Sequence, residues 1–172
     1  MTIDGVGCLL FAPPTVVFDT PFPFGRTYLP VTLKGLDRRE DWGRWNRQGD
    51  VEVTFSADTG RMAVDRDAFL NLQLAPRLRP GLAGQRLVLA WGGDRRAETL
   101  LAERAWISLP VRREDWRGGS RLVGLTLRVT LPDAGPEAGA ADGRPRAVQF
   151  EDASFTFVPR GRVVASAGAP PR

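Results

Sequence analysis

The sequence predicts an all-β protein, a single-domain antiparallel sandwich of two sheets with a jelly-roll-like arrangement. Three observations lead to this fold class. Apolar and polar residues alternate in one short segment after another, which gives each strand one buried face. The 19 glycines and 14 prolines are numerous enough to separate these segments by turns. Repeated crossover helices, which a parallel α/β fold requires, are missing, and 172 residues suit one domain with a real core.

The N-terminal third contains the first three expected strands. Residues 15–19 form the first, and the proline- and phenylalanine-rich residues 21–25 follow, where proline prevents regular structure. This proline-rich stretch is either a clamp over the core or a docking strip for another chain. The second strand lies within residues 26–36, and Pro30 places it at a sheet edge or makes it begin later. Residues 50–56 alternate cleanly and bury Val51, Val53 and Phe55.

The middle of the chain predicts further strands joined by turns. Residues 57–60 have the composition of a turn. Residues 69–76 alternate again, with Leu70, Leu72 and Leu74 inward. Residues 85–91 form a strand that ends in a hairpin tip at residues 92–94. Residues 98–111 combine a strand with some helical character at their start. Trp106 belongs to the strand portion and is expected in the core, whereas residues 112–120 are a polar loop containing Trp116.

The last part of the chain holds the strongest strand, residues 121–131. Its odd-numbered apolar residues share one face: Val123, Leu125, Leu127, Val129 and Leu131. Residues 132–145 are rich in Gly, Ala and Pro and predict a flexible loop. A pair of strands is expected within residues 146–158, with Val148, Phe150, Phe155 and Phe157 in the core. The domain division is an N-terminal arm with the first strand at 1–30, a sandwich at 31–158 and a flexible tail at 159–172.

Composition limits the function classes. The formal charge is +4, and Lys34 is the only lysine among 24 basic residues. Because the arginines alternate with acids and form no basic run, we expect no nucleic-acid partner. Histidine, the commonest general base and zinc ligand, is absent, and no aspartate-rich loop suggests calcium. We therefore expect no metal ion and no cofactor. Cys8, the single cysteine, predicts a buried inert thiol and no internal disulfide.

The N-terminus does not resemble a targeting segment. The apolar residues 6–11 have no basic residue before them and are followed by two prolines. The run is also too short to span a bilayer. We expect a protein made in the cytoplasm that does not insert into a membrane.

The most distinctive stretch is residues 37–49, in which Trp42 and Trp45 lie three apart among charges and glycines. Indole rings suit the C–H-rich faces of sugars. Arg44, between them, would bond hydroxyls or an acidic sugar, and Asp41 would accept bonds from sugar hydroxyls. Two interpretations remain open: the rings are exposed for stacking, or one or both cap the core. Arg44 likewise has the alternative of a solvated or locally paired guanidinium.

Two other tryptophans are secondary carbohydrate-binding candidates. Trp91 stands just before the predicted hairpin tip, and Trp116 lies in the predicted polar loop. Asp94 and Asp115 lie close to these two rings, as Asp41 does to Trp42. The acid pairs that catalysis would require, 40–41 and 114–115, stand close to arginines that keep carboxylates ionised. We therefore expect no catalytic residues and no enzyme activity.

The motif Glu40-Asp41-Trp42-Gly43-Arg44-Trp45, with Gly49, resembles a signature of carbohydrate-binding-module-like β-sandwich domains attached to bacterial glycosyltransferases. The similarity continues through residues 72–76, 84–91 and 121–131 and covers roughly residues 31–158. Asp41 is an insertion relative to that signature, and no glycosyltransferase portion accompanies it. The resemblance implies a non-catalytic module that binds a glycan.

Two functions follow as hypotheses. In the first, the protein recognises a bacterial surface or envelope polysaccharide, for example as the attachment component of a phage-like particle. In the second, it is a structural or assembly protein of a multi-protein particle with no glycan ligand. A proline-rich arm at residues 13–30 that docks on a scaffold protein fits both the attachment component and the assembly protein. The second function further predicts that both tryptophans of the motif are buried and that the chain forms a homo-oligomer.

Overall fold

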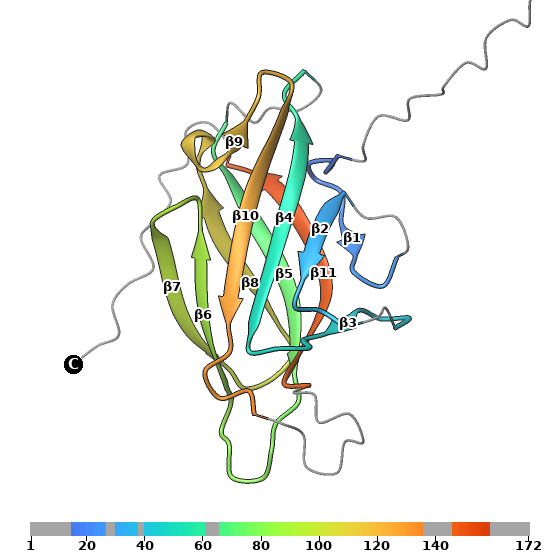
Figure 1. Ribbon diagram of the computed structural model, residues 1–172, viewed down its shortest axis with the longest axis vertical. Helices are drawn as coiled ribbons and strands as arrows, with labels where there is room; N and C mark the ends of the chain where they lie inside the picture. Colours follow the sequence, from blue (N-terminus) through green and yellow to red (C-terminus); the bar gives the residue numbers. More distant parts are fainter. Residues whose placement is uncertain (1–14, 27–29, 38–39, 61–65, 136–145, 159–172) are drawn as a thin grey trace, which may run out of the picture.

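The computed structural model describes residues 15–26, 30–37, 40–60, 66–135 and 146–158. Two antiparallel sheets lie one behind the other, as the layers of Figure 1 show. This confirms the two-sheet β-sandwich predicted from the alternating segments. The predictions for Cys8, for residues 136–145 and for the tail at 159–172 lie outside the described residues.

The first sheet has five strands, and β11 (Val148–Phe157) is at its centre. On one side β11 pairs with β5 (Ala68–Pro76), which in turn pairs with β8 (Ala105–Val111). Two short strands share the other side of β11, namely β1 (Phe22–Pro23) and β3 (Arg44–Trp45). The edge of β11 is thus covered by two segments that are far apart in the sequence.

The second sheet has six strands. Along its main path the order is β2 (Val31–Lys34), β4 (Asp50–Asp58), β10 (Leu122–Thr130), β6 (Gln85–Trp91) and β7 (Arg95–Leu101). The two-residue β9 (Arg117–Gly118) pairs with the start of β10. A short 3-10 turn, Arg113–Asp115, precedes β9.

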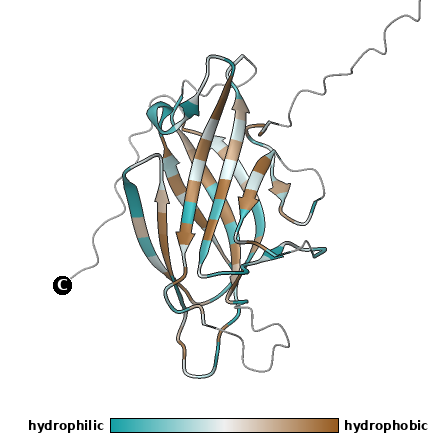
Figure 2. Cartoon of the chain, in the orientation of Figure 1, coloured by the Kyte–Doolittle hydropathy of each residue, from teal (hydrophilic) through white to brown (hydrophobic). Residues whose placement is uncertain are grey.

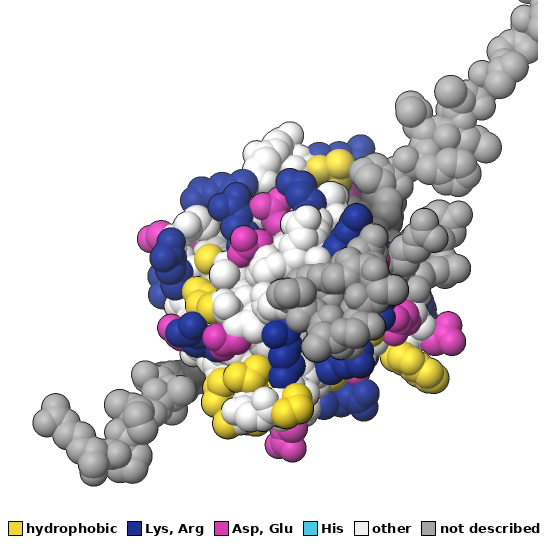
Figure 3. Space-filling model, turned by 60° about the horizontal axis from the view of Figure 1, so that its bottom comes forward, with side chains coloured by type: hydrophobic (Ala, Val, Ile, Leu, Met, Phe, Trp, Pro, Cys, Tyr) yellow, Lys and Arg dark blue, Asp and Glu magenta, His cyan; other side chains and the backbone are white. Residues whose placement is uncertain are grey.

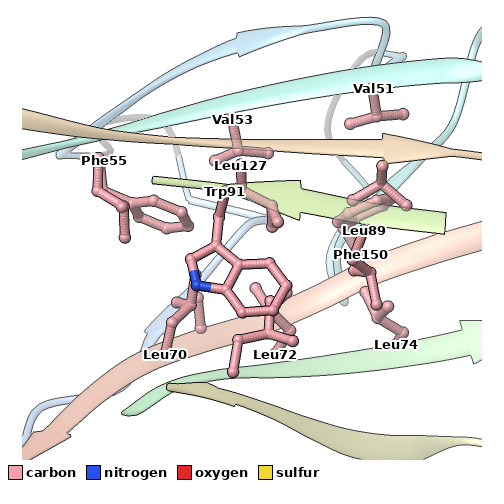
Figure 4. Packing of buried hydrophobic residues seen from close by; sticks show 14 of the residues in the cluster. Val51, Val53, Phe55, Leu70, Leu72, Leu74, Leu89, Trp91, Leu127 and Phe150 are labelled. Carbon is pink, nitrogen blue, oxygen red and sulfur yellow. The ribbon is translucent and has the colours of Figure 1, made fainter. Parts of the chain in front are cut away.

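The core fills the space between the sheets. Brown and paler bands alternate along β4 and β10 in Figure 2, and the inward residues of these strands are buried. Leucines from β5 and β6 and phenylalanines from β4 and β11 meet in this layer (Figure 4). The inward residues predicted for residues 50–56, 69–76 and 121–131 are therefore confirmed.

The start of the chain differs from the prediction. Residues 15–19 form no strand; Val16 donates its amide hydrogen to the Ser56 carbonyl, and Asp19 turns the chain with a positive φ of 59°. Phe22 and Phe24 then enter the core, where Phe22 packs against Phe55 and Phe24 against Phe150. The described part of the proline-rich stretch is thus a clamp over the core, the first of the two alternatives.

Two other segments differ from the sequence prediction. Residues 95–111 form two complete strands, β7 and β8, without a helix. Residues 148–157 form one strand, β11, where a pair was expected. Its register against β5 shifts between Phe150 and Asp152, so Glu151 sits in a bulge. That extra residue breaks the alternation of apolar residues, which is why the sequence suggested two strands.

Candidate functional site

The aromatic loop, residues 40–45, is a tight hairpin held against the first sheet. The amide of Glu40 donates to the Gly43 carbonyl at 2.8 Å, and the amide of Gly43 donates back at 3.3 Å. The last two residues of the loop form β3, which pairs with Gln149 and Phe150 of β11. The loop is therefore fixed to the sandwich at its base, with Asp41 and Trp42 at its tip.

Gly43 is required because the loop backbone lies directly against β11. A Cβ atom at this position would overlap the carbonyl oxygen of Phe150. Backbone atoms of a central strand have little room to move, so any side chain here pushes β3 away from β11. The glycine in the Trp-Gly-Arg-Trp motif is thus explained by close packing.

We expect Gly43→Ala to lower the free energy of unfolding by about 1–3 kcal/mol through this overlap. Gly49→Ala is the matched control, since the nearest atom to its new methyl group is 3.7 Å away. The control should leave stability unchanged or raise it by up to about 1 kcal/mol. Urea denaturation of both variants measures the difference, and equal midpoints would show that the loop does not pack as described.

The indole of Trp42 projects into solvent. Its side chain is 71% exposed, the highest value among the large exposed hydrophobic residues of the described part. Asp41, beside it, is also exposed. Trp45 is half-buried, and its Nε1 donates to Glu40 Oε2 at 3.1 Å. The two tryptophans therefore differ: Trp42 is exposed, as stacking on a ligand requires, and Trp45 is partly covered by the protein.

Arg44 anchors the aromatic loop through hydrogen bonds to backbone carbonyls. Its Nε donates to the Phe24 carbonyl at 2.9 Å and its Nη1 donates to the Asp37 carbonyl at 3.4 Å. These bonds tie β3 to the segment after β1 and to the segment after β2. The guanidinium of Arg44 is therefore bonded within the protein, the second of the two alternatives given for it.

Asn46 is a second anchor of the aromatic loop, and the sequence alone did not indicate this role. Its side chain is fully buried, and its Oδ1 accepts hydrogen bonds from the amides of Ala147 and Val148 at 2.7 and 2.8 Å. Its Nδ2 donates to the Gln48 carbonyl at 3.0 Å. The chain leaving the aromatic loop is thus bonded to the start of β11. An asparagine within a turn-rich stretch is the only sequence signal, and turns use asparagine for many reasons.

Trp91 and Trp116 lie in the core, so the structure does not place them where a ligand would meet their ring faces. Trp91 is 5% exposed; it is packed among leucines and phenylalanines (Figure 4), and its Nε1 donates to the Pro110 carbonyl at 2.8 Å. Trp116 is 7% exposed and packs against Phe155 with ring centroids 5.3 Å apart. Both rings belong to sandwich packing, although their positions beside turns suggested exposure.

Trp106 shows the opposite correction. It was expected in the core, but its side chain is 50% exposed on β8. Its neighbours Ala105 and Ile107 pack against the core, so alternation turns Trp106 to the outer face of the first sheet, beside Gln73 of β5. The sequence showed a strand here correctly but could not show which of its faces is inward.

The acids beside the tryptophans have different environments. Asp115 is buried; it accepts a bond from Arg95 Nε at 3.0 Å and another from the Arg112 amide at 2.7 Å. It therefore holds the chain between β8 and β9. Asp41 remains exposed at the tip of the aromatic loop, where a ligand can reach it.

The outer face of the second sheet is hollowed in two places. A first hollow of about 450 Å³ lies over β2, β4 and β10, and Lys34 and Gln48 are among its lining residues. A second hollow of about 540 Å³ lies over β6 and β10, and its lining includes Arg96 and Arg117. Arg128 lines both hollows, so they are neighbours along one face. We call the two hollows together the basic groove.

Glu52 sits where the two hollows meet. Its carboxylate accepts bonds from Lys34 Nζ at 2.7 Å and from Arg128 Nε at 3.1 Å. These two hydrogen bonds, the one from Lys34 first, hold the pKa of Glu52 below its usual value. Glu52 is therefore ionised at neutral pH and partly neutralises the two bases beside it.

Charges of both signs are mixed over the surface, as Figure 3 shows for one face. Within the described ranges, no group of three or more histidine, cysteine, aspartate or glutamate side chains is arranged to hold a metal ion. The same residues contain no helix that is both long and apolar enough to cross a membrane.

No protein-family model matches this chain, and no curated protein does. Among solved structures, it is similar to BtGH115A, a 4-O-methyl-α-glucuronidase with specificity for decorated arabinogalactans, with a TM-score of 0.42 and 11% identity. That match covers 68% of this chain and only 14% of the glucuronidase. It is also similar to TmCBM61 in complex with β-1,4-galactotriose, with a TM-score of 0.39, 10% identity and coverage of 81% and 88%. At such identities, any ligand has to be argued from the residues of this chain.

Proposed function

We propose that this protein binds a carbohydrate without cleaving it, and that Trp42 is the ring on which a sugar stacks. The observation that carries the proposal is the 71% exposed indole of Trp42 at the tip of a hairpin fastened to the sheet. A ligand that covers a large apolar ring removes the ring from water, which is favourable. A fixed hairpin loses little conformational entropy when a ligand arrives.

Two carboxylates suited to sugar hydroxyls belong to the same loop as the ring. Asp41 is exposed next to Trp42, and the Glu40 carboxylate lies at the base of the same turn, where it accepts from the indole nitrogen of Trp45. A hydrogen bond from a hydroxyl group to a carboxylate is stronger than a hydrogen bond between two neutral groups. A flat apolar surface with acceptors at its rim matches a pyranose ring, which has a C–H-rich face and a belt of hydroxyls.

The finer proposal is that the glycan is a bacterial surface or envelope polysaccharide, and that the protein serves attachment, for example in a phage-like particle. It is supported by the resemblance of the motif at residues 40–45 to glycosyltransferase-associated modules. Both this attachment role and the competing role of an assembly protein include a proline-rich arm that docks on a scaffold protein. Because Phe22 and Phe24 are buried in the core, these two rings are not available for docking.

The test is a titration of the protein with purified bacterial capsular and O-antigen polysaccharides, followed by tryptophan fluorescence and calorimetry. We expect saturable binding to at least one polysaccharide and no increase in reducing ends after prolonged incubation. Failure of the whole panel to bind would contradict carbohydrate recognition. Shortening of a bound polysaccharide would show that the protein is an enzyme.

A further inference from the structure

We propose that the basic groove on the second sheet is a second glycan-contacting surface, and that it selects acidic polysaccharides. This inference rests on the proposed function and adds the chemical class of the ligand. The anionic substituents of a hydroxyl-rich polymer would bind in the groove, whereas Trp42 would contact an apolar face of one of its sugars. None of the residues that line this groove belongs to the sequence motif at residues 40–45.

Three guanidinium groups border the second hollow, from Arg96, Arg117 and Arg128. Within the described residues, Arg96 and Arg117 make no ion pair, while Arg128 is bonded to Glu52. Small residues, Ala90 and Gly124 among them, line the hollow between these bases. Planar guanidinium forks bind carboxylate, sulfate and phosphate oxygens in a bidentate manner, so this hollow fits a projecting anionic group.

The acids at the second hollow do not cancel its positive character. Asp50, a further acid of the basic groove, lines the first hollow only, where it accepts a bond from the Thr130 hydroxyl. Glu52 is bonded to Lys34 and Arg128, so it is shared between two bases. Asp115 is 3% exposed and paired with Arg95, a cation that lies outside the lining of the second hollow. The two unpaired arginines therefore remain as a local excess of positive charge, which attracts an anion.

The shape and the mixture of groups favour an extended, hydroxyl-rich ligand. Glu52, Arg128 and Thr130 line both hollows, so a polymer can lie across the two in succession. The Glu52 carboxylate can accept bonds from hydroxyl groups but repels a phosphate at the middle of the groove. Duplex DNA, which has no hydroxyl groups along its backbone, therefore fits less well than an acidic polysaccharide, which carries hydroxyl groups beside its carboxylates.

The basic groove also leads toward the aromatic loop. Gly35 and Gln48 line the first hollow, and they flank the segment that carries the loop. The Arg47 amide donates to the Gly35 carbonyl at 2.7 Å, and Leu36 is bridged to Asn46. The two chain segments that enter and leave the aromatic loop thus meet at the end of the groove. One extended glycan can follow this path from the second hollow toward Trp42.

The test compares polygalacturonate with its fully methyl-esterified form, in about 0.15 M salt. The two polymers share one sugar backbone, and esterification removes the carboxylate charge. We expect the protein to bind the acidic form at least tenfold more tightly. The double variant Arg96→Gln/Arg117→Gln should reduce this preference about tenfold, because each exposed charge pair contributes a modest part of the affinity. Both side chains are unpaired in the described structure, so the thermal midpoint should not fall.

Arg121→Gln is the control, since Arg121 is exposed and lies outside the lining of the groove. It should lose much less of the preference than the double variant. The proposal is overturned if the wild type binds both forms equally or neither, if the control matches the double variant, or if duplex DNA of equal charge binds as tightly as polygalacturonate. The Trp42→Ala variant separates the two proposals: full affinity for polygalacturonate retained without Trp42 would refute stacking on the loop while leaving the groove in place.

Discussion

Replacing Trp42 with alanine is expected to weaken binding of the cognate polysaccharide about 10- to 100-fold while leaving the fold intact. The ring is 71% exposed, so its removal costs the protein little packing. Covering an aromatic ring with a ligand contributes about 1–3 kcal/mol, and each 1.4 kcal/mol is about tenfold in affinity. Calorimetric titration is the suitable measurement, because the substitution itself alters the tryptophan fluorescence.

Trp106→Ala is the matched control for this prediction. It also removes an exposed indole, but from β8 on the outer face of the first sheet, away from the aromatic loop in the fold. We expect affinity within about twofold of the wild type. Both variants should unfold within about 2 °C of the wild type, as surface substitutions usually do. If Trp106→Ala abolished binding and Trp42→Ala did not, the glycan would bind on the outer face of the first sheet.

Asn46→Ala is expected to cause the largest loss of stability among the substitutions considered. Its Oδ1 accepts bonds from the amides of Ala147 and Val148, and alanine leaves both amides buried without a partner. Each unsatisfied buried group costs about 1–3 kcal/mol, so we expect the free energy of unfolding to fall by about 2–6 kcal/mol. Urea denaturation monitored by circular dichroism measures this directly.

Asn71→Ala provides the comparison. Asn71 is half-buried on the outer face of β5, where its Oδ1 accepts a bond from the Ser108 hydroxyl and its Nδ2 donates to the hydroxyls of Ser154 and Thr156. Its partners are thus hydroxyl groups, which can rotate, and not backbone amides. We expect a smaller loss than at Asn46, less than about 1.5 kcal/mol, because no buried backbone amide is left without a partner. A loss at Asn46 no greater than that at Asn71 would show that the connection between the aromatic loop and β11 is not a structural anchor.

Strand positions and their inward faces were predictable because the period of the side chains is a local property. Val51, Val53 and Phe55 alternate with polar residues over a full strand, and their burial follows from the pleat once one face meets a core. The same reasoning located Leu70, Leu72 and Leu74 in β5. Where one extra residue interrupts the period, as Glu151 does in β11, the same reasoning produced a break that the structure does not contain.

The exposure of the tryptophans was not predictable in this way. Trp91 and Trp116 adjoin turns, but neighbouring strands cover them, whereas Trp106 lies inside a strand and faces outward. In each case the answer depends on which strand packs over the ring, which is a property of residues distant in the sequence. The two-residue strands β1 and β3 are equally invisible locally, since each exists only because β11 offers an edge to pair with.

By itself, the sequence determined the fold class, most of the strands and the motif that carries Trp42, because alternation and turn chemistry act between near neighbours. Only the tertiary structure decided that Trp42 is exposed, that Arg44 and Asn46 fasten the loop, and that Arg96, Arg117 and Arg128 border one hollow. These three arginines come from three strands, and pairing between strands β6, β7, β9 and β10 brings them together. The physical reason is that burial and charge clustering depend on long-range strand pairing, which leaves no periodic trace in the chain.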